Sequence, residues 1–89
     1  MNSEDYFFRD SWATADKYIA RLLKNVDEDP ATAIDQSIAA ILVSRCRKHI
    51  RNMSQNEIYQ LTANIPSLKK KRASERKAIS QAAYVMLNY

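Results

Sequence analysis

The chain has 89 residues, 46% hydrophobic and 27% charged, which indicates one ordinary globular domain over residues 1–89 and excludes a disordered tail. Glycine is absent where average usage would give about six, which excludes glycine-dependent phosphate loops and nucleophile elbows and argues against β-hairpins. The net charge of +4 divides unevenly, because residues 1–44 carry eight acids and four bases whereas residues 45–89 carry ten bases and two acids. This basic C-terminal half, 45–89, predicts an anionic partner.

The first predicted helix covers residues 3–26. Ser3 is a suitable N-cap, and two acids follow it in the first turn. The apolar residues recur at intervals of three and four, so they share one helical face: Phe8, Trp12, Ala15, Ile19, Leu22 and Val26.

The second predicted helix covers residues 30–53. Asp29 is placed to cap it, and Pro30 occupies the first helical position, where a missing N–H costs nothing. Its apolar side is formed by Ile34, Ile38, Ile41, Leu42, Cys46 and Ile50. Residues 38–43 are apolar on every side, which predicts that this stretch is surrounded by protein.

The third predicted helix is short and covers residues 54–64. Ser54 and Glu57 have the spacing of a capping box. Ile58, Leu61 and Ile65 are predicted to face inward, and Asn64 is predicted to end the helix in a left-handed conformation.

The fourth predicted helix covers residues 67–88 and is opened by Pro66. Its apolar face is formed by Leu68, Ile79, Ala82, Ala83 and Met86. Charged residues interrupt this face between Leu68 and Ile79, so the first three turns are expected to extend beyond the core. Residues 82–87 are apolar all round. Together with residues 38–43 they exceed what one small domain easily buries, so a homodimer through the second helix, the fourth helix or both is expected.

Catalytic and metal sites are not predicted. Cys46 and His49 have the spacing of two zinc ligands, but the sequence holds no further cysteine or histidine. Adjacent turns of one helix also point both side chains the same way, without a third group to orient them. The carboxylates fall on exposed faces or at helix starts. We therefore expect no catalytic residue, metal, cofactor or small-molecule substrate, and no enzymatic activity.

Cellular location is constrained by three observations. The single Cys46 cannot form an intramolecular disulfide, which favours a reducing, cytoplasmic setting. The sequence lacks a run of about 18 apolar residues, so no membrane contact by a spanning helix is expected. Its first ten residues do not have the layout of a secretory signal.

The basic residues form the candidate binding site. On the second predicted helix, Arg47, Lys48 and Arg51 share a face. On the fourth, Lys69, Arg72 and Arg76 share a face, which is flanked by Lys70, Lys71 and Lys77. Closely spaced cations release counterions when they contact phosphates, and arginine adds bidentate contacts. The alternatives are an acidic protein partner and a solvated surface that the acidic half neutralises.

The third and fourth predicted helices, joined by a turn at residues 64–67, have the outline of a helix-turn-helix. The turn lacks glycine, and Lys70 falls where a recognition helix should bury an apolar residue. The usual motif therefore fails, and we expect the fourth helix to hold the DNA backbone rather than bases. Most aromatic residues lie in the first helix, away from the cations, which favours duplex DNA or protein over single strands.

The sequence thus predicts an all-α bundle of about four helices with short connections, at roughly 3–26, 30–53, 54–64 and 67–88. The first functional hypothesis is a small DNA-binding accessory or regulatory protein, of the kind that plasmids and phages encode, that contacts duplex phosphates. The second is a protein-binding inhibitor, immunity or adaptor module whose basic face docks on an acidic protein.

Overall fold

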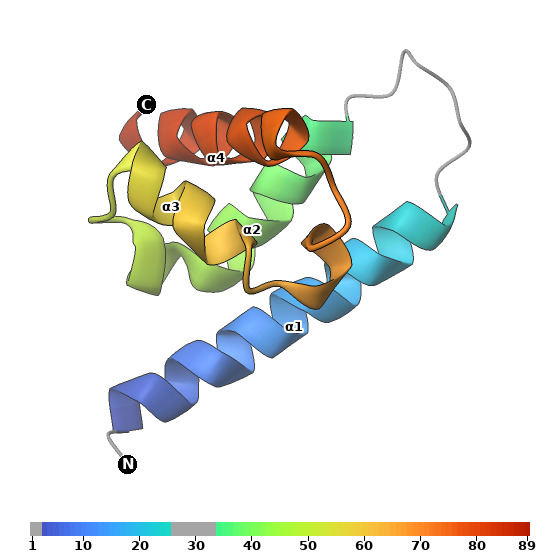
Figure 1. Ribbon diagram of the computed structural model, residues 1–89. Helices are drawn as coiled ribbons and strands as arrows, with labels where there is room; N and C mark the ends of the chain where they lie inside the picture. Colours follow the sequence, from blue (N-terminus) through green and yellow to red (C-terminus); the bar gives the residue numbers. More distant parts are fainter. Residues whose placement is uncertain (1–2, 26–33) are drawn as a thin grey trace.

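The computed structural model describes residues 3–25 and 34–89, and side chains within 11–24 and 34–89. It contains the α-helices α1 (Ser3–Asn25), α2 (Ile34–Ile50), α3 (Gln55–Thr62) and α4 (Ala73–Asn88), and the 3₁₀ helix η1 (Pro66–Leu68) (Figure 1). The described residues contain no strand. The predicted all-α bundle is therefore confirmed. The predicted start of the second helix, at Asp29 and Pro30, lies outside the described residues.

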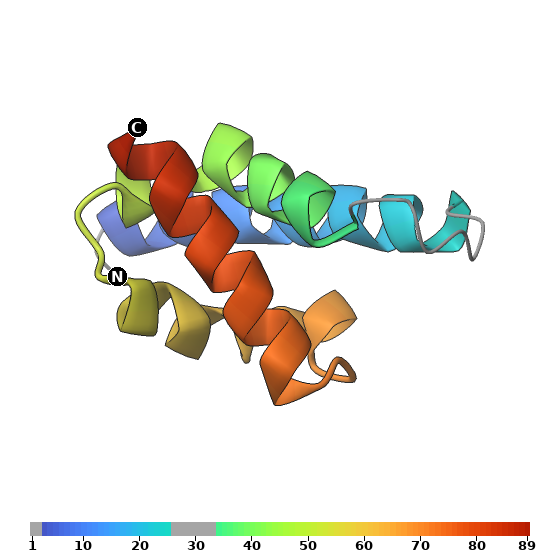
Figure 2. The same ribbon diagram turned by 90° about the horizontal axis from the view of Figure 1, so that it is seen from above.

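The helix α2 is at the centre of the bundle. It packs against α1 on one side and against α4 on the other, and α3 packs against α4 (Figures 1 and 2). Within residues 38–43, Ile38, Ala39, Leu42 and Val43 are buried, and Ile41 is half-buried. One chain therefore encloses most of this stretch, whereas Ala40 remains exposed, so the prediction of complete enclosure is wrong at that position.

The apolar faces predicted for the other helices also supply the core. The residues without solvent exposure include Ala15 and Ile19 of α1, Ile58 of α3, and Ile79 and Ala83 of α4. The end of α4 is less enclosed: Ala82, Tyr84, Met86 and Leu87 are half-buried, and Val85 is 45% exposed. Among the residues whose side chains are described, the exposed large hydrophobic residues are therefore Val85 and Tyr89 at the end of α4 and Tyr18 of α1.

The start of α3 confirms the predicted capping box. The Glu57 N–H donates to the Ser54 hydroxyl oxygen at 3.1 Å, and the Ser54 N–H donates to Glu57 Oε1 at 3.1 Å. The predicted end of α3 is wrong, because no described residue has a positive φ. Instead, the Asn64 N–H donates to the Leu61 carbonyl at 2.9 Å, and the Ile65 N–H donates to the Thr62 carbonyl at 3.3 Å. These successive tight turns keep φ negative.

The predicted start of the fourth helix at residue 67 is also wrong. Residues 66–68 form η1, residues 69–72 turn, and α4 begins only at Ala73. The physical reason is a pair of anchors on η1: Leu68 is fully buried, and the Ser67 N–H donates to Asp16 Oδ1 of α1 at 2.9 Å. The chain therefore lies against α1 at this point, and residues 67–72 do not extend past the core as helical turns.

Candidate nucleic-acid interface

The first basic group lies at the C-terminal end of α2. Arg47, Lys48 and Arg51 are exposed there, and residues 51–54 lead directly into α3. Cations at this position also interact favourably with the carbonyl end of the helix dipole. The three predicted residues are thus brought together and are accessible to a partner.

The second basic group lies in the turn between η1 and α4. Lys69, Lys70 and Arg72 are exposed, whereas Lys71 is half-buried and forms an ion pair with Glu75, Nζ to Oε2 at 3.3 Å. Among the described residues this is the one salt bridge. Buried Leu68 holds the N-terminal end of this turn, and α4 holds its C-terminal end. Three cations therefore project from a fixed segment without an acidic partner in the described part of the chain.

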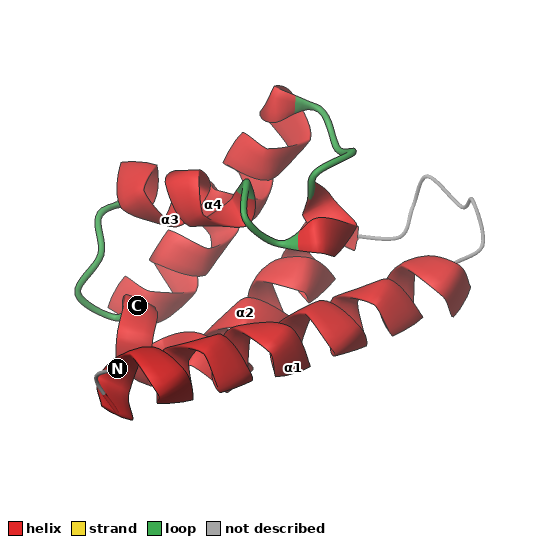
Figure 3. Cartoon of the chain, turned by 60° about the horizontal axis from the view of Figure 1, so that its bottom comes forward, coloured by secondary structure: helices red, strands yellow, loops and turns green. Residues whose placement is uncertain are grey.

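The two basic groups do not form one patch. The helix α3 lies between them: its start is next to the end of α2, and its far end leads through residues 63–65 to η1 (Figure 3). The views in Figures 1 and 2 agree that the end of α2 and the 69–72 turn lie toward opposite sides of the bundle. Because the turn precedes α4, the prediction that Lys69, Arg72 and Arg76 share one helical face is wrong.

Arg76 faces α3 and contacts Tyr59. Its guanidinium carbon lies 4.8 Å from the centroid of the Tyr59 ring, and its Nη2 donates to the Tyr59 hydroxyl oxygen at 3.3 Å. Arg76 is half-buried. The contact joins α3 to α4 across a separation of 17 residues, which no local sequence pattern encodes. Arg76 therefore contributes to the packing of α3 against α4 and is only partly exposed.

Lys77 is exposed on α4, one position beyond Arg76. It lines an open hollow of about 370 Å³ between α3 and α4, together with Gln55, Asn56, Tyr59 and Ser80. Apart from the lysine, this hollow is lined by neutral polar groups and one aromatic ring.

Arg45 is a further exposed cation near the end of α2, outside the candidate site predicted from the sequence. Its guanidinium carbon lies 4.3 Å from the centroid of the Tyr18 ring of α1, and Arg21 lies 5.7 Å from the same centroid. The Arg45 contact joins α2 to α1, whereas the Arg21 contact lies within α1, and such cation–π contacts contribute about 0.5–1 kcal/mol each at exposed sites. Arg45 is thus occupied at an aromatic face, unlike Arg47 and Lys48.

The third and fourth helices do not have the helix-turn-helix arrangement that the sequence predicted. The connection between α3 and α4 runs from residue 63 to 72 and contains η1, so the predicted turn at 64–67 is wrong. A helix-turn-helix normally uses a turn of about three or four residues. The long connection places the basic residues of 69–72 ahead of α4 rather than along it.

The remaining sequence candidates give no reactive group. Cys46 is fully buried, and burial raises the pKa of its thiol to about 12, so the nucleophilic thiolate is suppressed at neutral pH. The described residues hold no group of three or more histidines, cysteines or carboxylates that could bind a metal ion. No described helix has both the length and the apolar character needed to cross a bilayer.

Comparisons with known proteins leave the site to be interpreted from its geometry. No protein-family model matches the chain, and no significant match was found among curated proteins or among solved structures.

Proposed function

We propose that this chain is a small non-enzymatic DNA-binding accessory or regulatory protein that contacts the phosphates of duplex DNA. The observation that carries the proposal is the turn at residues 69–72, where Lys69, Lys70 and Arg72 are exposed and have no ion-pair partner among the described residues. The anchors at Leu68 and Asp16 fix this turn before binding, which lowers the entropic cost of holding several cations against a phosphate backbone.

The start of α4 supports an anionic ligand at the same place. Its N-cap residue, Arg72, makes no side-chain hydrogen bond to the first turn. The N–H groups at a helix start carry partial positive charge, which adds to the field of the three cations.

Duplex DNA is favoured over single strands by the aromatic residues nearby. A single-strand site needs an open ring on which bases stack. The Tyr59 ring already has the Arg76 guanidinium over it, 4.8 Å from the ring centroid. The basic turn thus offers charge without an obvious free stacking surface beside it.

The test is a fluorescence-anisotropy titration of a labelled random duplex at several salt concentrations. If Lys69, Lys70 and Arg72 each contact a phosphate, replacing all three with glutamine should reduce the slope of log K against log salt by about 2.7. The matched control replaces Arg47, Lys48 and Arg51 with glutamine. The three phosphate contacts of the turn should by themselves lower the DNA affinity of the wild type about forty-fold when the salt concentration rises from about 50 to about 200 mM.

Two outcomes would contradict this assignment. If the control triple variant loses the salt dependence and the turn variant keeps it, the DNA-binding surface is the end of α2. If the wild-type protein does not bind the duplex at the lower salt concentration, the nucleic-acid function is rejected.

A second candidate function is an inhibitor, immunity or adaptor module that binds an acidic protein. The observation in its favour is the separation of the two basic groups by α3 (Figure 3). A straight duplex contacts one side of a small domain, whereas an irregular acidic protein can cover both groups. Copurification of a stoichiometric acidic protein with the wild type, and its loss in both triple variants, would support this function.

We also propose a cytoplasmic homodimer formed at the end of α4. Val85 is 45% exposed and lies beside the half-buried Met86, so dimerisation would cover apolar surface that one chain leaves open. The lone, buried Cys46 is compatible with a reducing compartment. Sedimentation equilibrium should give twice the 10.3 kDa chain mass, and a monomer at about 100 µM would reject the dimer.

A further inference from the structure

The exposed face of α4 differs in chemistry from the turn that precedes the helix. The buried residues Ile79, Ser80 and Ala83 fix which side of α4 faces the core. The residues on the opposite side recur at intervals of three and four, and all are exposed: Ser74, Lys77, Gln81, Val85 and Asn88. No acid lies on this face, because Glu75 lies to one side and forms its ion pair with Lys71.

The first half of this face carries hydrogen-bonding groups that suit base edges. A lysine ammonium donates to the O6 and N7 acceptors of guanine, a glutamine amide pairs with N6 and N7 of adenine, and a serine hydroxyl suits either base. Lys77, Gln81 and Ser74 supply these groups. Between them lies the half-buried Ala78, whose methyl side chain does not prevent close approach of the helix.

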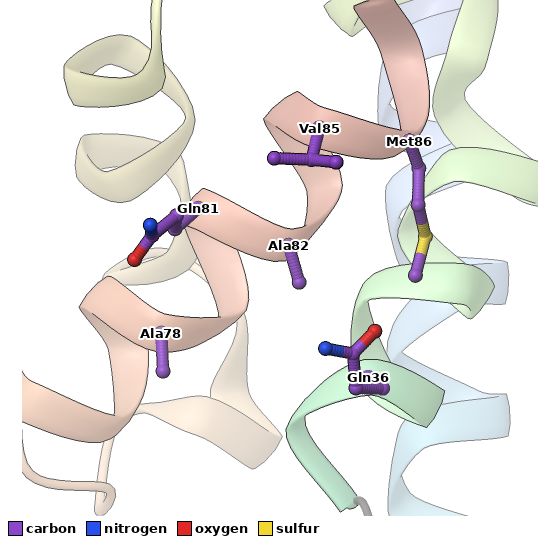
Figure 4. A pocket seen from close by; sticks show the side chains of 6 residues that line it. All are labelled: Gln36, Ala78, Gln81, Ala82, Val85 and Met86. Atoms are coloured by element: carbon purple, nitrogen blue, oxygen red, sulfur yellow. The ribbon is translucent and has the colours of Figure 1, made fainter. Parts of the chain in front are cut away.

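Gln81 is available for such contacts. It borders a hollow of about 380 Å³ with Gln36, Ala78, Ala82, Val85 and Met86. Figure 4 shows Met86 extending toward Gln36 at the start of α2, whereas the Gln81 amide is directed away from both. No hydrogen bond holds the Gln81 side chain to another described residue, so its amide can pair with a base.

The position of the basic turn orients the helix on a duplex. Lys69, Lys70 and Arg72 directly precede the N-terminus of α4. Recognition helices place their N-terminal residues at the base edges while flanking groups hold the backbone. From Ser74 to Gln81 the helix rises about 10 Å, which corresponds to about three base pairs of a duplex.

We propose that α4 enters the major groove and that Lys77 and Gln81 contact base edges, so that the protein prefers a site of about three base pairs containing guanine and adenine. This inference rests on the proposed binding of duplex DNA and adds sequence preference to it. It also assigns α4 a role beyond the backbone contacts that the sequence alone predicts.

The experiment is repeated selection from a pool of random duplexes, followed by affinity measurements on the enriched and random sequences. Wild-type protein should enrich a short motif. Gln81→Ala should lose the preference at one A·T position, and Lys77→Ala at one G·C position, by about five- to 150-fold each. The matched control is Gln60→Ala, an exposed amide on α3, which should bind random duplex within about twofold of wild type because it removes no charge.

Circular dichroism establishes that each variant is folded before it enters the selection. Salt-dependent binding without any enriched motif would overturn the base contacts and leave phosphate binding intact. A motif that is lost in Gln60→Ala but kept in Gln81→Ala and Lys77→Ala would also overturn the inference, because the contacts would then belong to α3. Absence of duplex binding at any salt concentration would reject both this inference and the proposed function.

Discussion

Asp16 links α1 to the turn that carries the basic residues, and its replacement by alanine is the most informative single change. The Asp16 carboxylate accepts the Ser67 N–H at 2.9 Å, across 51 residues of sequence. Ser67 lies in the first turn of η1, where N–H groups lack partners within the helix. Asp16→Ala removes the acceptor and leaves this part-buried donor without its protein partner.

The expected cost follows from the type of contact. Hydrogen bonds to charged groups contribute about 1.5–3 kcal/mol, and loss of a helix cap typically costs about 1 kcal/mol. Because the contact is part-buried, water can replace some of the bond. We therefore expect the free energy of unfolding to fall by about 1–2 kcal/mol. Asp16→Asn, which keeps one acceptor oxygen but not the charge, should lose about half as much.

The assay is urea denaturation followed by helical circular dichroism, with Lys17→Ala as control. Lys17 is exposed on α1 next to Asp16. The slope of free energy against urea should stay constant while the midpoint falls. Amide exchange in residues 66–72 should also accelerate in Asp16→Ala, because the turn loses one of its two anchors and keeps only buried Leu68. If Asp16→Ala unfolds within about 0.3 kcal/mol of Lys17→Ala, the anchoring role is refuted.

Two further predictions concern Arg76 and Cys46. Arg76→Ala should lower the free energy of unfolding in urea by about 1–2 kcal/mol, because it removes both the ring contact and the hydrogen bond to Tyr59, whereas Tyr59→Phe should cost about 0.5–1 kcal/mol. An Arg76→Ala variant that is as stable as wild type but binds DNA weakly would show instead that Arg76 acts on phosphate. Burial raises the pKa of the Cys46 thiol from 9.0 to about 12, so the neutral thiol stabilises the fold fully below pH 9, and this contribution is lost as pH rises toward 12. At pH 10 the wild type should have lost roughly 1 kcal/mol more stability, relative to pH 7, than Cys46→Ala loses, and an equal pH response would contradict the burial argument.

Much of the fold could be predicted because its signals are local. The spacing of four residues between Ala15 and Ile19, and between Ile38 and Leu42, places each pair on one helical face whatever the rest of the chain does. The capping box of Ser54 and Glu57 likewise depends on two residues that are three apart. These elements appear in the structure where the sequence indicates them.

The candidate site was predicted as a set of residues but not as a surface. Exposure of Arg47, Lys48, Lys69 and Lys70 follows from the cost of burying a charge. Their division into two groups on either side of α3 depends on how the helices pack. The local sequence also favoured one continuous helix from residue 67, since its residues are mostly good helix formers.

By itself, the sequence determined the helical class, the core-facing residues and the concentration of positive charge in residues 45–89, because periodicity, capping and composition act over a few residues. Only the tertiary structure decided where α4 begins and which basic side chains are exposed without an ion-pair partner. Burying Leu68 and satisfying the Ser67 N–H with Asp16 outweighs the weak preference of residues 67–72 for a helix. The contact with Tyr59 likewise turns Arg76 toward α3. Both effects join residues far apart in sequence, so they arise only once the helices have packed.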